Sequence, residues 1–462
     1  MAGRLQRRGG GSLSYYTGLV ANALFPLHER LKGHTTIDAF HEMEKSQWLS
    51  QPDIEQLQLK SLRTFLANIG KRVPYYRDLF NKLEFYPEQL RSLSDLQALP
   101  LLGKPEIKAN TERMKAEGAH NLQRFNTGGS SGEPLIFYLG KERVSHDVAA
   151  KRRATRWWDV DIGDPEIVVW GSPIELGAQD RVRLLRDKLF RTELLSAFEM
   201  SEENLQRFVE RICTVKPRML FGYPSSLALI AQFAQNSSRR LDDLGVKVVF
   251  VTSERLYDYQ RESIERVFGC PVANGYGGRD AGFIAHQCPE GALHITAEDI
   301  VVEIVDGQGK TLPAGSAGEI VVTHMRTGDF PFVRYRTGDV GALGEQGCSC
   351  GRGLPILAKL EGRSTDFVKA ADGTVIHGLA LIYVLRDLPQ VQAFKIVQET
   401  LASITVQLVV PDETSRADIE LTVTEQFRRR LGAELQVSFE YLAAVEPEAS
   451  GKFRYVISKL DG

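Results

Sequence analysis

A loop rich in glycine and hydroxyl residues precedes an apolar segment near residue 130. The stretch NTGGSSGEPLIFY combines three glycines with Thr127, Ser130 and Ser131. Glycines let backbone N–H groups turn toward one anion, and hydroxyl groups add further donors. A loop of the Walker A type also needs a Lys after its last glycine, and no Lys stands there. Alone, the loop indicates either a phosphate site without its own lysine or a plain surface turn.

Three further motifs carry side chains that suit a nucleotide. In NGYGGRDAG, Tyr276 beside Gly277 at a strand end can stack on a base, and Asp280 can reach a metal ion or a phosphate. In PFVRYRTGDVG, the Asp339 carboxylate offers two acceptor oxygens at the spacing of two ribose hydroxyls. In EPEASGKFRY, Lys452 follows a glycine in a loop that gives it no evident structural task. Each motif alone is also compatible with an ordinary turn.

The cysteines and nearby histidines predict a metal site. The segments HQCPEGALH and CSC contain Cys288, Cys348 and Cys350. Three thiolates and one imidazole form a closed tetrahedral set of the kind that holds structural zinc. The fourth ligand is His294 or His286, and we favour His294, because His286 and Cys288 on one extended strand would form a strained chelate. The alternative is three free thiols.

The elements that must position these side chains alternate between helices and strands. Residues 1 to about 120 have apolar residues at three- and four-residue spacing, which is typical of helices. Over residues 121–294, turns precede short apolar runs such as EIVVWG and VKVVFVTS, and helical stretches separate them. This pattern predicts an α/β core with a parallel or mixed sheet. Over residues 295–345, two strand-like runs joined through DGQGKTLPAG predict a hairpin in a small β-barrel-like subdomain.

The last part of the chain has an α+β pattern. A strand pair is expected in AFKIVQETLASITVQLVV, a helix ending at Gly432 in SRADIELTVTEQFRRRLG, and a further strand in QVSFEYLAAV. We therefore expect an α/β fold with two domains. The large N-terminal domain, with mixed α/β sheets and the β-barrel-like subdomain, spans residues 1–362. The small, mobile α+β lid domain spans residues 363–462.

Composition limits the class of protein. The chain has 462 residues, 43% hydrophobic and 25% charged, with a net charge of -2, which argues against a nucleic-acid partner. No apolar run reaches the roughly 18 residues that span a bilayer. Five sparse cysteines do not form a secreted disulfide framework, so we expect a cytoplasmic monomer or homodimer. The apolar patch Leu19 to Phe25 predicts a docked N-terminal helix, with a weak membrane-surface contact as the alternative.

Taken together, the order and spacing of these motifs resemble the ANL superfamily of adenylate-forming enzymes, which includes acyl-CoA synthetases, peptide-synthetase adenylation domains and luciferases. The segments CPEGALHITAED, PFVRYRTGD and CSCGRGLP are similar to its phenylacetate–CoA ligase branch, with the CapK-type proteins. The resemblance runs from about residue 55 to the end of the chain. It implies that ATP and Mg²⁺ activate a carboxylic acid as an acyl-AMP with release of pyrophosphate. The acyl group then passes to an acceptor, for which coenzyme A is the commonest choice.

The resemblance also implies roles for individual residues. The glycine-rich loop would close over the β,γ-phosphates, with Leu135 where the family often has Lys. Tyr276 would stack on adenine, and Asp280, in place of a family Glu, would help hold Mg²⁺. Lys452 would reach the α-phosphate and the carboxylate from the mobile domain. The candidate catalytic residues are Lys452 and Asp280, and the candidate nucleotide-binding residues are Thr127, Gly129, Ser130, Ser131, Gly132, Ser253, Glu254, Tyr276, Gly277, Asp339 and Arg363.

Several functional alternatives stay open at this level. The acceptor could be an amine or a hydroxyl in polysaccharide or natural-product biosynthesis, as the CapK-type resemblance implies. A non-enzyme alternative is a catalytically silent nucleotide-binding homologue. The acid pocket would be walled by Trp170, Tyr223 and Pro224, which suits an apolar or aromatic acid, whereas the basic stretch RRATRWW would suit an anionic one.

Overall fold

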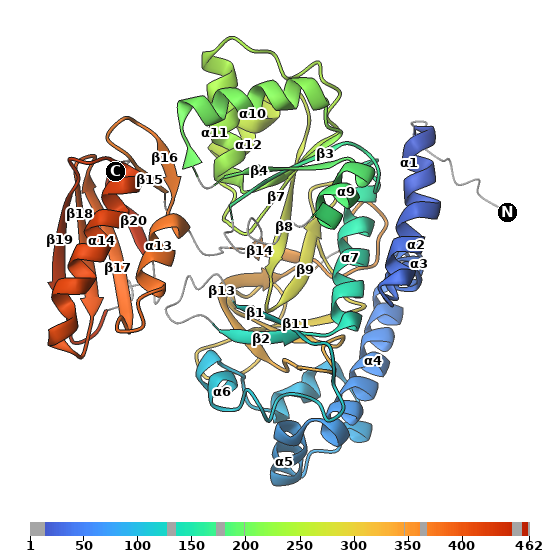
Figure 1. The fold of residues 1–462 in the computed structure, drawn as a ribbon. Helices are drawn as coiled ribbons and strands as arrows, with labels where there is room; N and C mark the ends of the chain where they lie inside the picture. Colours follow the sequence, from blue (N-terminus) through green and yellow to red (C-terminus); the bar gives the residue numbers. More distant parts are fainter. Residues whose placement is uncertain are drawn as a thin grey trace.

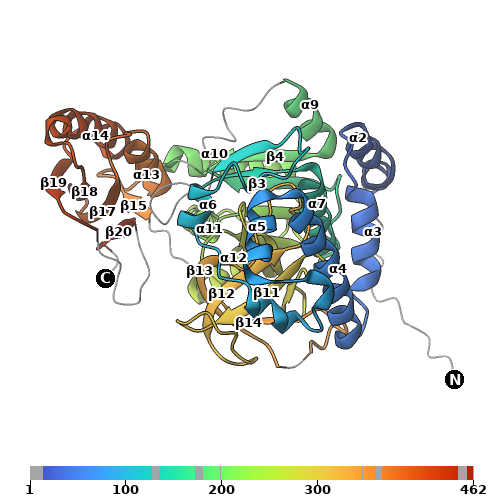
Figure 2. The ribbon, with the colours of Figure 1, turned by 90° about the horizontal axis from the view of Figure 1, so that it is seen from below.

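The computed structural model describes residues 14–126, 135–171, 181–197, 199–345, 347–360, 367–445 and 455–460. Figure 1 shows a large part built from sheets and helices, with the N-terminal helices along one side and a smaller C-terminal lobe on the other. The view from below separates the same two parts (Figure 2). The predicted α/β class, with a large mixed part and a small α+β part, is confirmed.

Helices dominate the first hundred or so residues, as predicted. They are α1 (Tyr15–Leu19), the π-helical turn η1 (Val20–Leu24), α2 (Phe25–Leu31), α3 (Thr36–Ser46), α4 (Gln51–Arg72), α5 (Pro74–Leu83), the 3-10 turns η2 (Pro87–Gln89) and η3 (Leu93–Ala98), and α6 (Lys104–Ala109). The Ser50 hydroxyl caps α4 by accepting from the Asp53 N–H at 3.3 Å. Pro74, which has no N–H to donate, opens α5. In the part of the chain that the structure describes, no helix is long and apolar enough to cross a membrane.

A seven-stranded sheet forms the centre of the large part, in the order β10-β9-β8-β7-β6-β3-β4. Its strands are β3 (Glu166–Trp170), β4 (Thr192–Ser196), β6 (Met219–Gly222), β7 (Val248–Thr252), β8 (Val272–Gly278), β9 (Gly282–Gln287) and β10 (Leu293–Ile295). From β4 to β8 neighbouring strands are parallel, whereas β9 and β10 are antiparallel at one edge. Both faces of the parallel part are covered, which explains its continuous apolar runs.

Helices pack on both faces of this sheet. They are α7 (Lys141–Arg156), α9 (Arg181–Phe190), α10 (Glu202–Val215), α11 (Pro224–Asn236) and α12 (Asp258–Phe268). Along β7, Val249 and Val251 join the core with α10, α11 and α12. Their neighbours Val248 and Phe250 join the core that contains Ala154 of α7. The strand period of two therefore assigns alternate side chains to the two helical layers.

A second sheet, antiparallel throughout, contains β11 (Ile300–Val305), β12 (Gly318–His324), β13 (Tyr335–Leu343) and β14 (Leu357–Leu360) in that order. It corresponds to the expected β-barrel-like subdomain, with β11 and β14 at its edges and with β14 beyond the expected end at residue 345. Asp306 shapes the turn after β11, because its carboxylate accepts from the N–H groups of Gln308 and Lys310, both at 2.9 Å. The hairpin predicted from the DG dipeptide is confirmed.

The C-terminal lobe has its own core. It contains β15 (Phe367–Lys369), β16 (Val375–His377), α13 (Leu379–Arg386), β17 (Ala393–Thr400), β18 (Ser403–Val409), η4 (Glu413–Ser415), α14 (Arg416–Leu431), β19 (Gln436–Tyr441) and β20 (Val456–Ser458). The predicted strand pair, the helix capped by Gly432 and the later strand are confirmed. The strand β5 (Glu199–Met200) of the large part pairs with β16. The expected boundary at residue 362 lies outside the described residues and stays a prediction.

A buried ion pair ties the second sheet to the N-terminal helical part. The Arg334 guanidinium on the approach to β13 is bidentate with Glu303 of β11, at 3.1 and 3.0 Å. Its remaining Nη1 donates to the Leu99 carbonyl at 2.7 Å. Arg334 and Glu303 are only 2% and 5% exposed. Removing one partner would leave the other charge buried without compensation.

We therefore expect Glu303→Gln to lower the free energy of unfolding by about 3–5 kcal/mol. A matched control is Glu319→Gln, which breaks the ion pair with Arg336 in the same sheet, where Arg336 is 52% exposed. That change should cost less than about 1 kcal/mol. Denaturant unfolding of both variants checks the prediction, and equal losses would contradict it.

Candidate active site

The parallel strands β7 and β8 end side by side at one edge of the central sheet. Their register pairs Thr252 with Gly275. Ser253 and Glu254, which follow β7, therefore lie at the same edge as Tyr276, near the end of β8. In open α/β sheets, ligands bind outside the carboxyl ends of the strands. The structure thus brings these predicted nucleotide-binding residues to the edge where a ligand is expected.

The segment after β7 is held in a fixed conformation. Ser253 has a φ of +73°, which a residue with a side chain adopts only when its surroundings impose it. The Glu254 carboxylate accepts from the hydroxyl and, at 3.4 Å, from the N–H of Ser225. Ser225 lies in the first turn of α11, so the negative charge of Glu254 sits at a helix N-terminus, where it is stabilised. Ser225 was not predicted as a site residue, although it directly follows Pro224 of the expected acid pocket.

Two tyrosine–aspartate hydrogen bonds join β8 to β13. The Tyr276 hydroxyl donates to Asp339 Oδ2 at 3.0 Å and lies 3.4 Å from Thr337 Oγ1. In the opposite direction, the Tyr335 hydroxyl donates to Asp280 Oδ2 at 2.6 Å. Tyr335 was missed as a site residue, although it stands in the motif that contains Asp339. The two candidate carboxylates are therefore held across the same pair of strands.

The turn between β8 and β9 is compact. A Cβ on Gly277 would lie 2.2 Å from the Gly282 carbonyl oxygen, so only glycine fits this position. The Ala281 N–H donates to Asp280 Oδ1 at 3.1 Å. The turn therefore fixes Asp280, and both of its oxygens are engaged.

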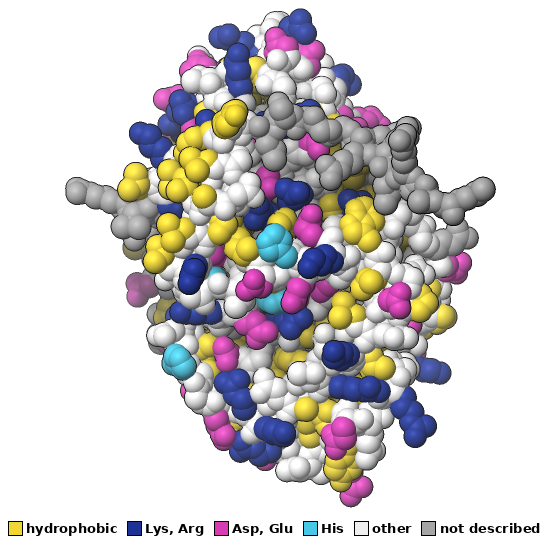
Figure 3. Space-filling model, turned by 90° about the vertical axis from the view of Figure 1, so that its right-hand side faces the viewer, with side chains coloured by type: hydrophobic (Ala, Val, Ile, Leu, Met, Phe, Trp, Pro, Cys, Tyr) yellow, Lys and Arg dark blue, Asp and Glu magenta, His cyan; other side chains and the backbone are white. Residues whose placement is uncertain are grey.

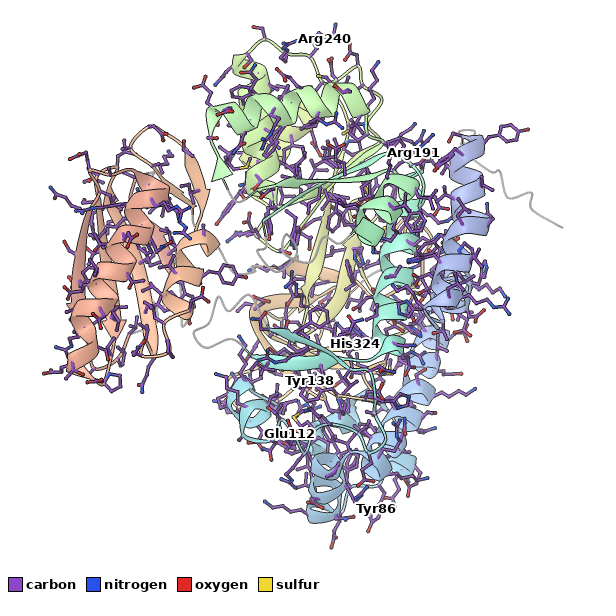
Figure 4. All side chains as sticks on the ribbon, in the orientation of Figure 1. Tyr86, Glu112, Tyr138, Arg191, Arg240 and His324 are labelled. Carbon is purple, nitrogen blue, oxygen red and sulfur yellow. The ribbon has the colours of Figure 1, made fainter. Side chains whose placement is uncertain are left out.

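Buried charged side chains lie next to this turn and hold it by a hydrogen bond. Arg143 of α7 is 1% exposed and donates from Nη2 to the Arg279 carbonyl at 3.4 Å. Its Nε donates to Asp147 Oδ2 at 2.8 Å. His324, labelled in Figure 4, lies beside the same group, and burial lowers its pKa to about 4. At neutral pH His324 is therefore uncharged and adds no positive charge beside Arg143.

The remaining predicted nucleotide-binding and catalytic residues lie outside the described residues; they are Thr127, Gly129, Ser130, Ser131, Gly132, Arg363 and Lys452. The strands on either side of the glycine-rich loop, β1 (Gln123–Asn126) and β2 (Ile136–Leu139), pair in antiparallel register. Leu135, at the end of the loop, is fully buried in the same core as Tyr276. The position where the family often has Lys is thus an apolar core position in this chain.

The predicted metal ligands Cys288, His294, Cys348 and Cys350 come together. Their ligand atoms all lie within 4.8 Å of one another. Cys288 Sγ is 3.7 Å from Cys348 Sγ, and Cys350 Sγ is 3.2 Å from His294 Nε2. Thiolates about 2.3 Å from a tetrahedral zinc ion lie about 3.8 Å apart, whereas a disulfide needs about 2.05 Å. The donor set and its spacing therefore fit zinc.

The surroundings of His294 keep its imidazole in the neutral form that can bind a metal ion. Burial lowers its pKa to about 4, so the imidazole is neutral and Nε2 can accept. The Leu354 carbonyl lies 3.2 Å from Nδ1, and by accepting from Nδ1–H it fixes the tautomer that leaves Nε2 free of a proton. His286 faces His294 in the strand register, but its ring packs against Phe283 and Phe250. The geometry groups His294, not His286, with the cysteines.

Two of the residues that were expected to line the acid pocket pack against each other. Trp170 stacks on Tyr223 with ring centroids 4.3 Å apart. The arginines of RRATRWW are used internally: Arg152 and Arg156 pair with Asp161, and Arg153 pairs with Glu298. These three arginines are therefore engaged in ion pairs with acids of the same chain. The alternative that this stretch meets an anionic acid stays a prediction.

The chain is similar in sequence to known proteins. Residues 368–459 match the family model described as the CapK C-terminal domain. The chain is 23% identical over 418 residues to the Protein CapK of Staphylococcus aureus, covering 88% of this chain and 90% of the relative. It is 23% identical over 399 residues to a phenylacetate-coenzyme A ligase of Thermus thermophilus, covering 84% and 85%.

The fold is shared with a solved adenylate-forming ligase. A crystal structure of 2-hydroxyisobutyryl-CoA ligase, with 2-HIB-AMP and CoA in the thioesterification state, superposes with a TM-score of 0.64 at 18% identity, covering 90% of this chain and 91% of the other. The relatives and the fold lead to one assignment. The chain belongs to the ANL superfamily of adenylate-forming enzymes, in the branch of the phenylacetate-CoA ligases and CapK-type proteins.

Proposed function

We propose that the protein activates a carboxylic acid with ATP as an acyl-AMP and then transfers the acyl group to coenzyme A. The observation that carries this proposal is the Tyr276–Asp339 hydrogen bond at the carboxyl edge of the central sheet. It sets an aromatic face next to a carboxylate with two acceptor oxygens, which suits an adenine ring next to its ribose. The relatives named as phenylacetate-coenzyme A ligases support the same reaction class.

In the proposed reaction, a carboxylate oxygen of the acid attacks the α-phosphorus of ATP, and the bond from that phosphorus to the bridging oxygen of pyrophosphate breaks. Mg²⁺, when bound, would screen the phosphate charge. Asp280 stands beside Tyr335 at the site edge, where its carboxylate could help hold the ion. Lys452, on the C-terminal side, would stabilise the charge that develops at the α-phosphate and would move away for the second step.

The acceptor has a second candidate. Residues 368–459 match the CapK C-terminal domain, so transfer to an amine or a hydroxyl, which the CapK-type resemblance implied, is the alternative to coenzyme A. A pyrophosphate-release screen over aryl, acyl and amino acids, each with and without coenzyme A, separates the two. Release that needs an amine or a sugar in place of coenzyme A would select the alternative.

Replacing Lys452 by Ala should lower carboxylate-dependent exchange of pyrophosphate into ATP by at least about a hundredfold, because a charge aimed at the transition state is lost. Lys459→Ala is the matched control, since Lys459 lies on the same C-terminal segment and its ammonium pairs with Glu399 at 2.6 Å. Exchange at the wild-type rate in the Lys452 variant would overturn the proposed mechanism.

Two substitutions in the proposed nucleotide pocket should raise the KM for ATP by different amounts. Asp339→Ala should raise the KM for ATP at least about tenfold, because both ribose acceptors are lost. Tyr276→Phe keeps the aromatic face and should raise the KM by less than about fivefold. Steady-state kinetics with ATP as the varied substrate checks both values. If Tyr276→Phe were the more damaging change, the proposed pocket would be wrong.

We also propose that Cys288, His294, Cys348 and Cys350 hold a structural zinc ion. Metal analysis should find about one zinc per chain. Cys350→Ala should lose the metal and lower the melting temperature by at least about 5 °C. Cys213→Ala, in α10 and outside the cluster, is the matched control and should keep the metal. Much less than one zinc in the wild-type protein would refute this site.

A further inference from the structure

The helical run α1–η1–α2 turns an apolar stripe toward solvent. Its members are separated by four or eight residues, and they are Tyr15, Leu19, Leu27 and Leu31, with exposures of 101%, 52%, 55% and 80%. The opposite side of the run is buried and carries Val20, Ala21 and Phe25. Residues four apart lie on one side of a helix. These helices therefore pack only one face against the core, and the leucines on their other face are exposed to solvent.

The helix α9, about 160 residues further on, adds leucines to the same region. Leu184, Leu185 and Leu189 are 50%, 69% and 40% exposed. The Tyr16 hydroxyl donates to the Leu189 carbonyl at 2.8 Å, and the Phe25 and Phe190 rings meet at 5.9 Å. The two helical segments are thus packed together. We call the exposed apolar residues of both segments, Tyr15, Leu19, Leu27, Leu31, Leu184, Leu185 and Leu189, the leucine face.

Positive charge accompanies the leucine face. Residues 14–33 and 181–191 contain seven Lys and Arg residues against two acids, although the whole chain has a net charge of -2. Of the two acids, Glu29 is buried and Asp187 pairs with Arg186. Arg191, labelled in Figure 4, stacks on the Tyr16 ring at 4.1 Å where α9 meets α1. Figure 3 views this side of the molecule and shows hydrophobic side chains next to Lys and Arg over its upper part.

A cavity of about 310 Å³ opens between α2, α7 and α9. Phe25 and Phe190 supply apolar walls, and the lining carries both cations, such as Lys32 and Arg186, and acids, such as Glu29 and Asp187. It adjoins the first residues of β3 and β4, at the sheet edge opposite the candidate active site.

We propose that the leucine face docks the protein on an anionic phospholipid membrane. Leucines beside an aromatic residue enter the boundary between headgroups and acyl chains, while Lys and Arg remain at the phosphates. The thirteen residues before Ser14 add three arginines and no acid. A second copy of the chain fits less well, because a twofold contact through this face would bring the same basic residues together. The proposal is independent of the reaction at the candidate active site.

Vesicle flotation with the full-length protein tests this docking. The probe is a vesicle with equal parts of phosphatidylglycerol and phosphatidylcholine, compared with phosphatidylcholine alone. The protein should float with the anionic vesicles and not with the neutral ones, and added salt should weaken the binding. Failure to float with anionic vesicles at low salt would overturn the proposal.

Two pairs of variants separate the apolar and the charged contributions. Leu31→Asp combined with Leu185→Asp should lower the vesicle partition coefficient at least about tenfold. The matched control is Leu421→Asp in α14, since Leu421 is 70% exposed and distant in sequence from both segments. Lys188→Glu should weaken binding to anionic vesicles, whereas Lys82→Glu in α5 should not. Unchanged melting temperatures show that the variants fold.

Sedimentation velocity of the same variants tests the alternative that a second copy of the chain docks on the leucine face. If the wild-type protein is a dimer that the leucine-face variants dissociate without loss of vesicle binding, the face joins two copies and the proposal is wrong. Equal loss of vesicle binding in the Leu421 control would also contradict it. Unchanged pyrophosphate exchange in the leucine-face variants is expected, so a failed docking test leaves the proposed reaction intact.

Discussion

The hydrogen bonds that cross between β8 and β13 are the constraint on which the candidate active site depends. Tyr276 donates to Asp339 in one direction, and Tyr335 donates to Asp280 in the other. The strands belong to different sheets, one largely parallel and one antiparallel. Both carboxylates are therefore positioned by tyrosines of the opposite strand, and neither sheet alone could place the two. The buried Arg143 and the glycine at position 277 serve the same end, because they fix the turn that carries Asp280.

The cysteine cluster lies beside β9 and β10, the antiparallel edge strands of the central sheet. Cys288 follows β9, His294 lies in β10, and Cys348 and Cys350 come from the segment between β13 and β14. A metal ion held there would join the outer strands of the central sheet to the second sheet. The Arg334–Glu303 ion pair links that second sheet to the N-terminal helical part. The two links brace the sheets whose contact forms the site.

The sequence was most informative where chemistry requires a particular residue type. The cysteine spacing and the preference for His294 over His286 agree with the geometry, because a closed four-ligand set tolerates few arrangements. Strand and helix periods gave the fold class and the C-terminal helix that ends at Gly432. Partner residues were harder to predict. Ser225 and Tyr335 act through contacts between residues 29 and 55 positions apart, which no local pattern reveals. The ion pairs of the basic stretch RRATRWW could not be predicted for the same reason, since their partners include Glu298.

The proposed function depends on attack by a carboxylate oxygen of the acid on the α-phosphorus of ATP. Oxygen-18 in the carboxylate of an accepted acid tests this directly, because the acyl transfer that follows breaks the bond between the acyl carbon and that oxygen. Mass spectrometry of the products should then find one labelled oxygen in AMP and none in pyrophosphate. Unlabelled AMP, or label in inorganic phosphate accompanied by ADP, would contradict adenylation and with it the proposed function.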